Sequence, residues 1–277
     1  MKLILPFILL MMTTVTLSGQ SVRVMTYNLR FDNPGDGINQ WSSRKEKVFN
    51  LLQKYQPDIV GTQEALQHQL TDITTHLSTY AYIGVGRDDG NTKGEYSAIL
   101  YNQEKFEVLE HQTFWLSLTP EVAGSKSWDA AITRVATWAK FKDKKTGKKF
   151  FILNTHFDHM GSEARLQSAA LIKRRLNALA DNLPVIVTGD FNCEPIEEPY
   201  LRMTAPADFT LKDAGDGSTT GTYCTFAVAG PPCKRIDYIF YSVKWKASAY
   251  LVITDHDGVN YPSDHLPVMC TFVSSKK

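Results

Sequence analysis

Carboxylate, amide and imidazole side chains interrupt or close apolar runs along the whole sequence. They are Asn28 in TYNL, Glu64 in GTQE, His156 in LNTHFDH, Asp190 and Asn192 in VTGDFN, Asp237 in RIDYIF, and Asp264 and His265 in SDHLPV. Burying an unpaired carboxylate in such a place costs several kcal/mol, so the set requires a bound cation or mutual pairing. Oxygen ligands without thiolates suit a hard divalent ion, magnesium before manganese.

Asp264 and His265 stand between two prolines in the segment YPSDHLPV. Proline fixes its own φ and disfavours helix at the residue before it, so this pair is held on a stiff loop that leads into a strand. A lone Asp-His pair is usually a surface hydrogen bond. The similar chemistry at the other strand ends favours a functional site here. For Asp158 and His159 we expect structural roles.

The set, in this order along the chain, resembles the endonuclease/exonuclease/phosphatase superfamily. Members of that superfamily include deoxyribonuclease I, abasic-site endonucleases, deadenylases, neutral sphingomyelinases and inositol-polyphosphate 5-phosphatases. The resemblance covers nearly the whole chain, from TYNLR to SDHLPV. It implies a four-layer α/β/β/α sandwich of the α/β class and metal-assisted hydrolysis of phosphate esters.

The resemblance also implies a role for each residue. Glu64 is the expected principal metal ligand, with Asn28 beside it and Asp264 near the metal. Asp237 is expected to pair with and orient His265, which contacts the scissile phosphate. The remaining expected roles are phosphate contact from the other side for His156, water activation for Asp190, and stabilisation of developing negative charge for Asn192.

The residue types fit this chemistry on physical grounds as well. A phosphodiester is anionic and resists attack, so hydrolysis needs charge neutralisation, an activated water and a protonated leaving oxygen. A carboxylate-bound cation supplies the first, and Asp190, desolvated at a strand end, supplies the second. His265 backed by Asp237 forms a couple that holds one imidazole tautomer and favours its protonated form. The sequence leaves open whether His265 donates a proton or acts as an electrostatic clamp.

Arg30 departs from the pattern of some nucleases in the superfamily. Those nucleases carry an Asp two residues after the first-strand Asn, where it can serve a second metal position. An arginine at this position favours a mechanism with a single catalytic magnesium, for which manganese is a substitute.

The substrate is expected to be a phosphoester, with nucleic acid favoured. The segments around Trp41 and Arg134 resemble a bacterial subgroup with deadenylase-like features. Arg134 and Arg44 are candidates to hold phosphate, and Trp41 to stack on a base or sugar. Tryptophans near strand ends equally often close a core. We therefore expect a magnesium-dependent phosphodiesterase, a nuclease on RNA or DNA.

Two alternatives stay open at this point. One is a phosphoesterase on phospholipid head groups or on inositol or sugar phosphates, which an exposed apolar loop beside the site would favour. The other is a catalytically inactive binding module on the same scaffold, against which the completeness of the polar set argues. The net charge of +1 means that any grip on nucleic acid must be local.

Strands and helices must position these residues, and their patterns can be read from the sequence. Helical spacing predicts a helix capped by Ser42 or Ser43 and ended by Pro57, a second over 66–77, a third over 162–179 and a short one near 197–203. Apolar runs predict strands at 21–29, 58–64, 80–86, 96–101, 106–116, 133–141, 148–157, 183–191, 235–242, 247–254 and 267–273. Two sheets packed face to face, with helices outside, are the simplest cover for so many strands.

The first residues have the layout of a secretory signal peptide: one lysine, an apolar run and then small residues. We expect residues 1–19 to be removed and 20–277 to form one domain, because no linker-like composition divides it. The predicted protein is exported, periplasmic or extracellular. It is expected to be a monomer with no membrane span and no stable protein partner.

Export makes the four cysteines candidates for oxidation. Cys224 and Cys233 flank a segment in which Gly-Pro-Pro must turn the chain, and a local disulfide between them is expected. Cys193 and Cys270 lie beside apolar strand residues and are expected to be buried thiols. None has the spacing of a zinc site.

Overall fold

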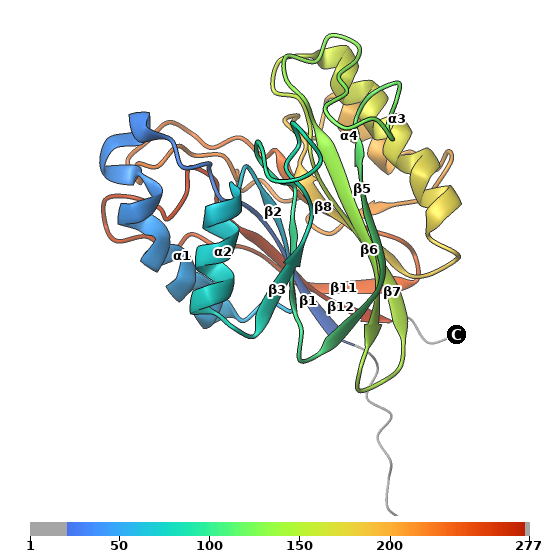
Figure 1. Ribbon diagram of the computed structural model, residues 1–277, viewed down its shortest axis with the longest axis horizontal. Helices are drawn as coiled ribbons and strands as arrows, with labels where there is room; N and C mark the ends of the chain where they lie inside the picture. The colour runs from blue at the N-terminus through green and yellow to red at the C-terminus, as the bar shows by residue number, and fades with distance from the viewer. Residues whose placement is uncertain (1–20, 275–277) are drawn as a thin grey trace, which may run out of the picture.

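Two six-stranded sheets form the centre of the computed structural model, which describes residues 21–274 (Figure 1). The strands of the first sheet are β1 (Ser21–Asn28), β2 (Ile59–Gln63), β3 (Tyr80–Ile83), β4 (Ile99–Asn102), β11 (Trp245–Val252) and β12 (Val268–Ser274). Those of the second are β5 (Phe106–Trp115), β6 (Val135–Asp143), β7 (Lys149–His156), β8 (Val185–Asp190), β9 (Lys212–Asp213) and β10 (Asp237–Tyr241). The strand orders are β11-β12-β1-β2-β4-β3 and β5-β6-β7-β8-β10-β9.

Helices cover the outer face of each sheet. α1 (Trp41–Tyr55) and α2 (Gln67–His76) lie on the first sheet, and α3 (Ser162–Leu179) and α4 (Glu198–Thr204) lie on the second (Figure 1). A short 3-10 helix, η1 (Pro34–Asn39), precedes α1. The layers therefore run α/β/β/α, which confirms the expected sandwich.

Three apolar cores hold the four layers together, and β1 shows how one strand serves two of them. Val24 of β1 faces the other sheet, where it belongs to the same core as Ile152 and Ile186. Its neighbour Met25 faces the helices and belongs to the core that includes Val48 of α1. Strands buried on both faces read as continuous apolar runs, which is why their polar ends stood out in the sequence.

Each sheet has one parallel pair at its centre, β1 with β2 and β7 with β8. The other strand pairs described in residues 21–274 are antiparallel. The two parallel pairs face each other across the interface between the sheets. Their carboxyl ends consequently meet at one edge of the sandwich, and this edge carries the polar residues.

Several element boundaries differ from the sequence expectation, and β9 was not expected; two of the differences have a clear physical reason. α1 begins at Trp41 rather than after a serine cap, because the carboxylate of Asp32 accepts a hydrogen bond from the Trp41 amide at 3.2 Å. β4 begins at Ile99, later than expected, because Tyr96 pairs with Ala65 as an isolated bridge outside the strand. In both places a residue outside the element sets the boundary.

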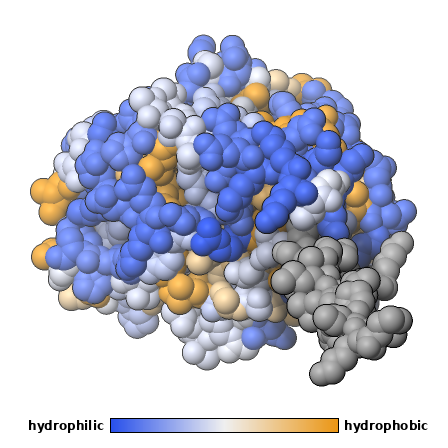
Figure 2. All heavy atoms as spheres, turned by 90° about the horizontal axis from the view of Figure 1, so that it is seen from below, coloured by the Kyte–Doolittle hydropathy of each residue, from blue (hydrophilic) through white to orange (hydrophobic). Residues whose placement is uncertain are grey.

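The predicted signal peptide, residues 1–19, lies outside the described residues. Within residues 21–274, no helix combines the length and apolar character that crossing a bilayer requires. The face shown in Figure 2 is largely hydrophilic, with apolar side chains scattered over it in small groups.

Candidate active site

The carboxyl ends of the two parallel strand pairs bring the polar residues together. Asn28 is the last residue of β1, and Glu64 directly follows β2. His156 ends β7, and its register partner Asp190 ends β8. In sheets of this kind, ligands bind outside the carboxyl ends of parallel strands.

A cavity of about 340 Å³ opens at this edge. Six of the eight expected residues line it, whereas Asn28 and Asp237 lie directly behind and bond to lining residues. The lining residues are Arg30, Phe31, Glu64, Glu95, Ile132, Arg134, His156, His159, Asp190, Asn192, Tyr223, Ile236, Asp264 and His265. The structure thus gathers the expected set around one cleft.

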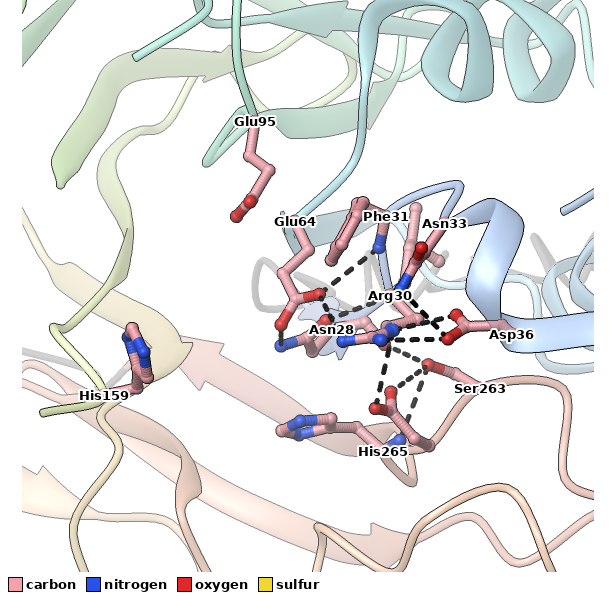
Figure 3. Close-up of polar contacts among 12 residues, drawn as sticks. Asn28, Arg30, Phe31, Asn33, Asp36, Glu64, Glu95, His159, Ser263 and His265 are labelled. Atoms are coloured by element: carbon pink, nitrogen blue, oxygen red, sulfur yellow. Dashed lines mark hydrogen bonds and ion pairs between the residues drawn. The ribbon is translucent and has the colours of Figure 1, made fainter. Parts of the chain in front are cut away.

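Glu64 directly follows β2 and has a φ of 63°, and Asn192, two residues beyond the end of β8, has a φ of 48°. The left-handed region costs a residue with a Cβ about 1–2 kcal/mol. The turn aims the Glu64 carboxylate at Asn28, whose Nδ2 donates to it at 3.0 Å, and at the Phe31 amide, which donates at 3.3 Å (Figure 3). Strain of this kind is typical of residues held in place for function.

His265 is paired with Asp237, as its neighbours in the sequence implied. Its Nδ1 lies 2.9 Å from Asp237 Oδ2, and both side chains are buried. Burial alone would lower the pKa of His265, but the charge and hydrogen bond of Asp237, with the charges of Asp190 and Asp264, outweigh it. The pKa of His265 is raised well above its ordinary value, and the ring is an imidazolium at neutral pH.

His156 lies across the cavity in the opposite electrostatic setting. Burial and the positive charges of Arg134 and Arg87 lower its pKa well below the ordinary value. The neutral ring accepts a hydrogen bond at Nε2 from Asn192 Nδ2, over 3.1 Å. Asn192 also donates to the Phe157 carbonyl at 3.0 Å, which fixes its orientation.

Asp190 lies between the two histidines. Its Oδ2 is 3.4 Å from His156 Nε2 and 3.7 Å from His265 Nε2. The Asn192 amide donates to Oδ1 at 2.9 Å, and Asn28 Nδ2 donates to Oδ2 at 3.0 Å. Burial and the charge of Asp237 raise the pKa of Asp190 to about 7, so this carboxylate can gain and lose a proton near neutral pH.

The donor set around Glu64 fits a hard divalent cation. Arg30 Nη1 is 3.9 Å from Glu64 Oε2, and Arg30 Nε is 4.0 Å from Asp264 Oδ2, so both carboxylates lie beside the same guanidinium. Burial raises the pKa of Asp264, and the nearby charge of Glu64 adds to the effect. A cation would neutralise this accumulation of negative charge with the oxygen ligands that magnesium and manganese accept.

A second group of ligand-type atoms, from Asp190, Asp237 and His265, lies within 4.8 Å. Its imidazole Nδ1 is already paired with Asp237, and the surrounding carboxylates raise the pKa of the ring, which favours the protonated form. An imidazolium has no lone pair to offer a metal. This group therefore fits proton chemistry better than metal binding.

Arg30 is fixed at the mouth of the Glu64 and Asp264 cluster. Its Nε and Nη2 donate to Asp36 at 2.9 Å each, a two-point ion pair. Its guanidinium also lies 4.7 Å from the centre of the Phe31 ring. The residue that departs from the nuclease pattern consequently places a permanent positive charge where an aspartate would hold a second metal.

Of the three expected substrate-binding residues, the structure brings only Arg134 to the cavity. Arg44 is buried, and its guanidinium donates to the carbonyls of Asn39, Leu29, Arg30 and Pro262. Trp41 is a core residue whose Nε1 donates to Asp72 at 2.9 Å. The substrate-binding roles expected for Arg44 and Trp41 are wrong, because both side chains stabilise the segment before α1.

The sequence interpretation of Asp158 agrees with the structure, and that of His159 does not. Asp158 is buried and accepts hydrogen bonds from four backbone amides, those of residues 131, 132, 160 and 161. His159 instead lines the cavity, with Nδ1 3.3 Å from Arg134 Nη2.

Among the other lining residues, two with polar groups, Glu95 and Tyr223, were missed from the sequence. Glu95 could have been found by the pattern that marked the others, since it directly precedes the apolar run YSAILY. Tyr223 is next to Cys224, which is bonded to Cys233 with the Cα atoms 4.3 Å apart. The Tyr223 ring lies 4.9 Å from the His265 ring, centre to centre.

Comparisons with known proteins agree with this geometry. Residues 25–265 match the family described as Endonuclease/Exonuclease/phosphatase family. A mannosyl-6-phosphatase from Bacteroides thetaiotaomicron is 39% identical, with a TM-score of 0.86 over 91% of this chain and 99% of that one. A second structure from the same species, of an endonuclease/exonuclease/phosphatase family protein, is 38% identical, with a TM-score of 0.89 over 94% and 100%.

Nocturnin from Homo sapiens is a more distant relative, 26% identical over 290 residues. The match takes in 91% of this chain but only 65% of nocturnin's length. The family model spans every residue from Met25 to His265, and the structure brings the polar residues of that span to one cavity. The chain therefore belongs to the endonuclease/exonuclease/phosphatase family, and it is a hydrolase of phosphate esters.

Proposed function

We propose that the protein is a divalent-cation-dependent phosphomonoesterase that acts on sugar phosphates. The observation that carries the hydrolytic part is the cavity that places Asp190, with its pKa of about 7, between a neutral and a charged histidine. The substrate class rests on the mannosyl-6-phosphatase, which is 39% identical across nearly the whole of both chains. A cavity of about 340 Å³ is also at the small end of the range for small-molecule sites.

Asp190 is the proposed general base. A base whose pKa lies near the working pH combines the correct protonation state with a useful driving force for proton transfer. Its two oxygens are oriented by Asn192 and Asn28 at 2.9 and 3.0 Å. In this role it accepts a proton from the water that attacks phosphorus.

His265 and Arg134 are proposed to bind the phosphoryl group. His265 carries a positive charge supported by Asp237, and it contacts the phosphoryl oxygens or protonates the leaving oxygen. Arg134 is 5% exposed, and its Nε has no hydrogen-bond partner among the described residues. An arginine that is buried and incompletely paired at a cavity wall is suited to a dianion. Asn192 adds a donor for the charge that develops in the transition state.

The divalent cation, magnesium with manganese as a substitute, would be held by Glu64 with Asn28 and Asp264. When bound, it neutralises charge on the phosphoryl group. Arg30 supplies a further fixed positive charge beside Glu64 and Asp264. That charge is shared with Asp36, which Arg30 contacts at two points.

A nuclease, the function expected from the sequence, is the second candidate. The family description itself covers endonucleases and exonucleases, which favours it. Against it, Trp41, the residue expected to stack on a base, is buried in the core. A catalytically inactive module is disfavoured because the polar set is complete and converges on one cavity.

We also propose that the protein is exported and that residues 1–19 are its signal peptide. The bond between Cys224 and Cys233 supports this, because disulfides persist in oxidising compartments. Amino-terminal sequencing of the protein recovered from the periplasm or medium tests it. A mature protein that still begins at Met1 would contradict the proposal.

The proposed activity is tested by a substrate panel measured with and without a chelator. The panel contains mannose 6-phosphate, glycerol 3-phosphate, p-nitrophenyl phosphate, bis-p-nitrophenyl phosphate, and single-stranded RNA and DNA. We expect hydrolysis of the monoesters, loss with the chelator and recovery with magnesium or manganese. Faster turnover of RNA, DNA or the model diester would replace the phosphomonoesterase with the second candidate.

A further inference from the structure

Glu95 is a carboxylate of the cavity wall that the proposed hydrolysis does not use. It directly precedes Tyr96, and its side chain projects into the space bounded by Glu64, His159 and His265 (Figure 3). We propose that Glu95 determines specificity by accepting hydrogen bonds from hydroxyl groups of the leaving group. This inference rests on the proposed function, because it identifies the leaving group as a neutral polyhydroxylated compound such as a sugar.

The Glu95 carboxylate is held in one orientation. Arg87 Nη1 donates to Oε2 at 2.6 Å and Arg87 Nη2 to Oε1 at 2.8 Å. Arg87 is itself fixed, since its carbonyl accepts a hydrogen bond from Trp115 Nε1 at 2.7 Å. On the other side, the backbone of Tyr96 pairs with Ala65, the residue after Glu64. A carboxylate ordered before the substrate arrives loses little entropy on binding.

The fixed carboxylate still has acceptor capacity. A carboxylate offers about four lone-pair positions, and the arginine takes one on each oxygen. Within residues 21–274, Arg87 supplies the only side-chain or backbone hydrogen bonds to the Glu95 carboxylate. The remaining positions are available at the cavity, and a hydroxyl donor can fill them with a charge-assisted hydrogen bond.

The Glu95 carboxylate also limits what can enter. Arg87 compensates the charge of Glu95, but the free positions of this carboxylate are acceptors, and a phosphate oxygen has no proton to donate to them. A sugar phosphate carries its charge only at the phosphoryl end, which Arg134 and His265 attract. A nucleic acid carries a phosphate at each nucleotide. Glu95 consequently favours a leaving group with many hydroxyls and no second phosphate.

The test compares wild type with Glu95→Gln on monoesters that differ in hydroxyl content: ethyl phosphate, glycerol 3-phosphate and mannose 6-phosphate. In the wild type, kcat/KM should rise along this series. In Glu95→Gln, kcat/KM for mannose 6-phosphate should fall about 10- to 100-fold, as expected for lost hydrogen bonds to a charged group. Hydrolysis of p-nitrophenyl phosphate, which has no hydroxyl, should stay within about twofold.

Glu107→Gln is the matched control, because Glu107 is a half-exposed carboxylate of β5 that pairs with Lys142 at 3.2 Å. It should leave every substrate unchanged. Glu95→Asp keeps the charge but shortens the side chain by one methylene. It replaces Glu95→Gln in the test if that variant has a lowered melting temperature. Free mannose should inhibit p-nitrophenyl phosphate hydrolysis by the wild type more strongly than by Glu95→Gln.

The possible results separate the two proposals. Equal losses on mannose 6-phosphate and p-nitrophenyl phosphate, or no loss on either, would overturn the role of Glu95 and leave the sugar phosphatase intact. A wild type that hydrolyses p-nitrophenyl phosphate but none of the hydroxylated esters would overturn the sugar phosphatase, and the role of Glu95 with it.

Discussion

The two histidines on opposite sides of the cavity are equally buried, but their pKa values are shifted in opposite directions. His156 is 5% exposed and His265 is 4% exposed, and both lie beside Asp190. The pKa of His156 is nevertheless lowered well below the ordinary value, and that of His265 is raised well above it. Burial has the same sign at both, so the partners make the difference: arginines at one, Asp237 at the other.

The comparison shows how one edge of the sandwich holds two histidines with different chemical roles. The neutral His156 accepts a hydrogen bond from Asn192 and can orient groups without adding charge. The charged His265 can attract a phosphoryl group or give up a proton. Asp190 lies between them. The proposed general base therefore has the neutral imidazole of His156 on one side and the charged imidazole of His265 on the other. Four predictions test this division, from the largest expected effect to the smallest.

Removing the charged histidine should have the largest effect. His265→Ala should lower kcat about 10²- to 10⁴-fold, the usual range for an acid–base or charge-stabilising group. Added magnesium should not restore activity, because the metal candidates are intact. The loss of kcat is measured as turnover of p-nitrophenyl phosphate against metal concentration, and circular dichroism verifies that the variant is folded. Activity near that of wild type in a folded variant would remove His265 from the mechanism.

Removing only the charge of Asp237 should bring the pKa of His265 closer to that of His156. Without that carboxylate, burial dominates and the pKa of His265 falls, so the ring loses its proton at lower pH. Asp237→Asn should reduce kcat/KM about 10- to 100-fold at neutral pH, less than His265→Ala does. The alkaline limb of the pH–rate profile should move to lower pH. A limb that stays in place would mean that it does not report His265.

The disulfide supports the His265 side and not the His156 side. Tyr223 forms a backbone bridge with His265, and the Cys224 amide donates to the Asp264 carbonyl at 3.0 Å. Replacing both Cys224 and Cys233 with Ser should cost roughly 2–3 kcal/mol in the chain-entropy account. That corresponds to a fall in melting temperature of about 4–6 °C for a domain of this size. Calorimetry tests it, and an unchanged melting temperature would contradict it.

The smallest predicted effect is the pH dependence of stability that the Asp190 carboxyl group contributes. Its folded pKa of about 7 lies above the value of about 3.9 for an unfolded aspartate. A raised folded pKa contributes stability that is complete below the unfolded pKa and is lost as pH rises through 7. Asp190→Asn cannot ionise, so without metal its melting temperature relative to wild type should rise by up to about 5 °C from pH 5 to pH 8. A constant difference would contradict the raised pKa.

The sequence was sufficient for the sandwich and for the residues at the ends of its central strands. Buried strands are continuous apolar runs, so a polar residue that closes one is visible without a structure. Asn28, Glu64, His156 and Asp190 were found in this way, and the two parallel pairs explain why they meet.

The sequence was insufficient where the partner of a side chain decides its role. Arg44 has the chemistry to bind phosphate, but backbone carbonyls from both ends of the chain occupy its guanidinium. Glu95 reaches the cavity because β4 pairs with β2, a pairing of distant segments that local patterns do not specify. His159 lines the cavity although it lies next to the structural Asp158.

The position of β12 has a consequence for the order in which the protein folds. β12 lies between β11 and β1, with Ser21 opposite Val273, so segments from opposite ends of the described residues pair with each other. Such distant pairings slow folding. Asp264 and His265 lie just before β12, so the His265 side of the cavity is complete only once β12 has paired with β1.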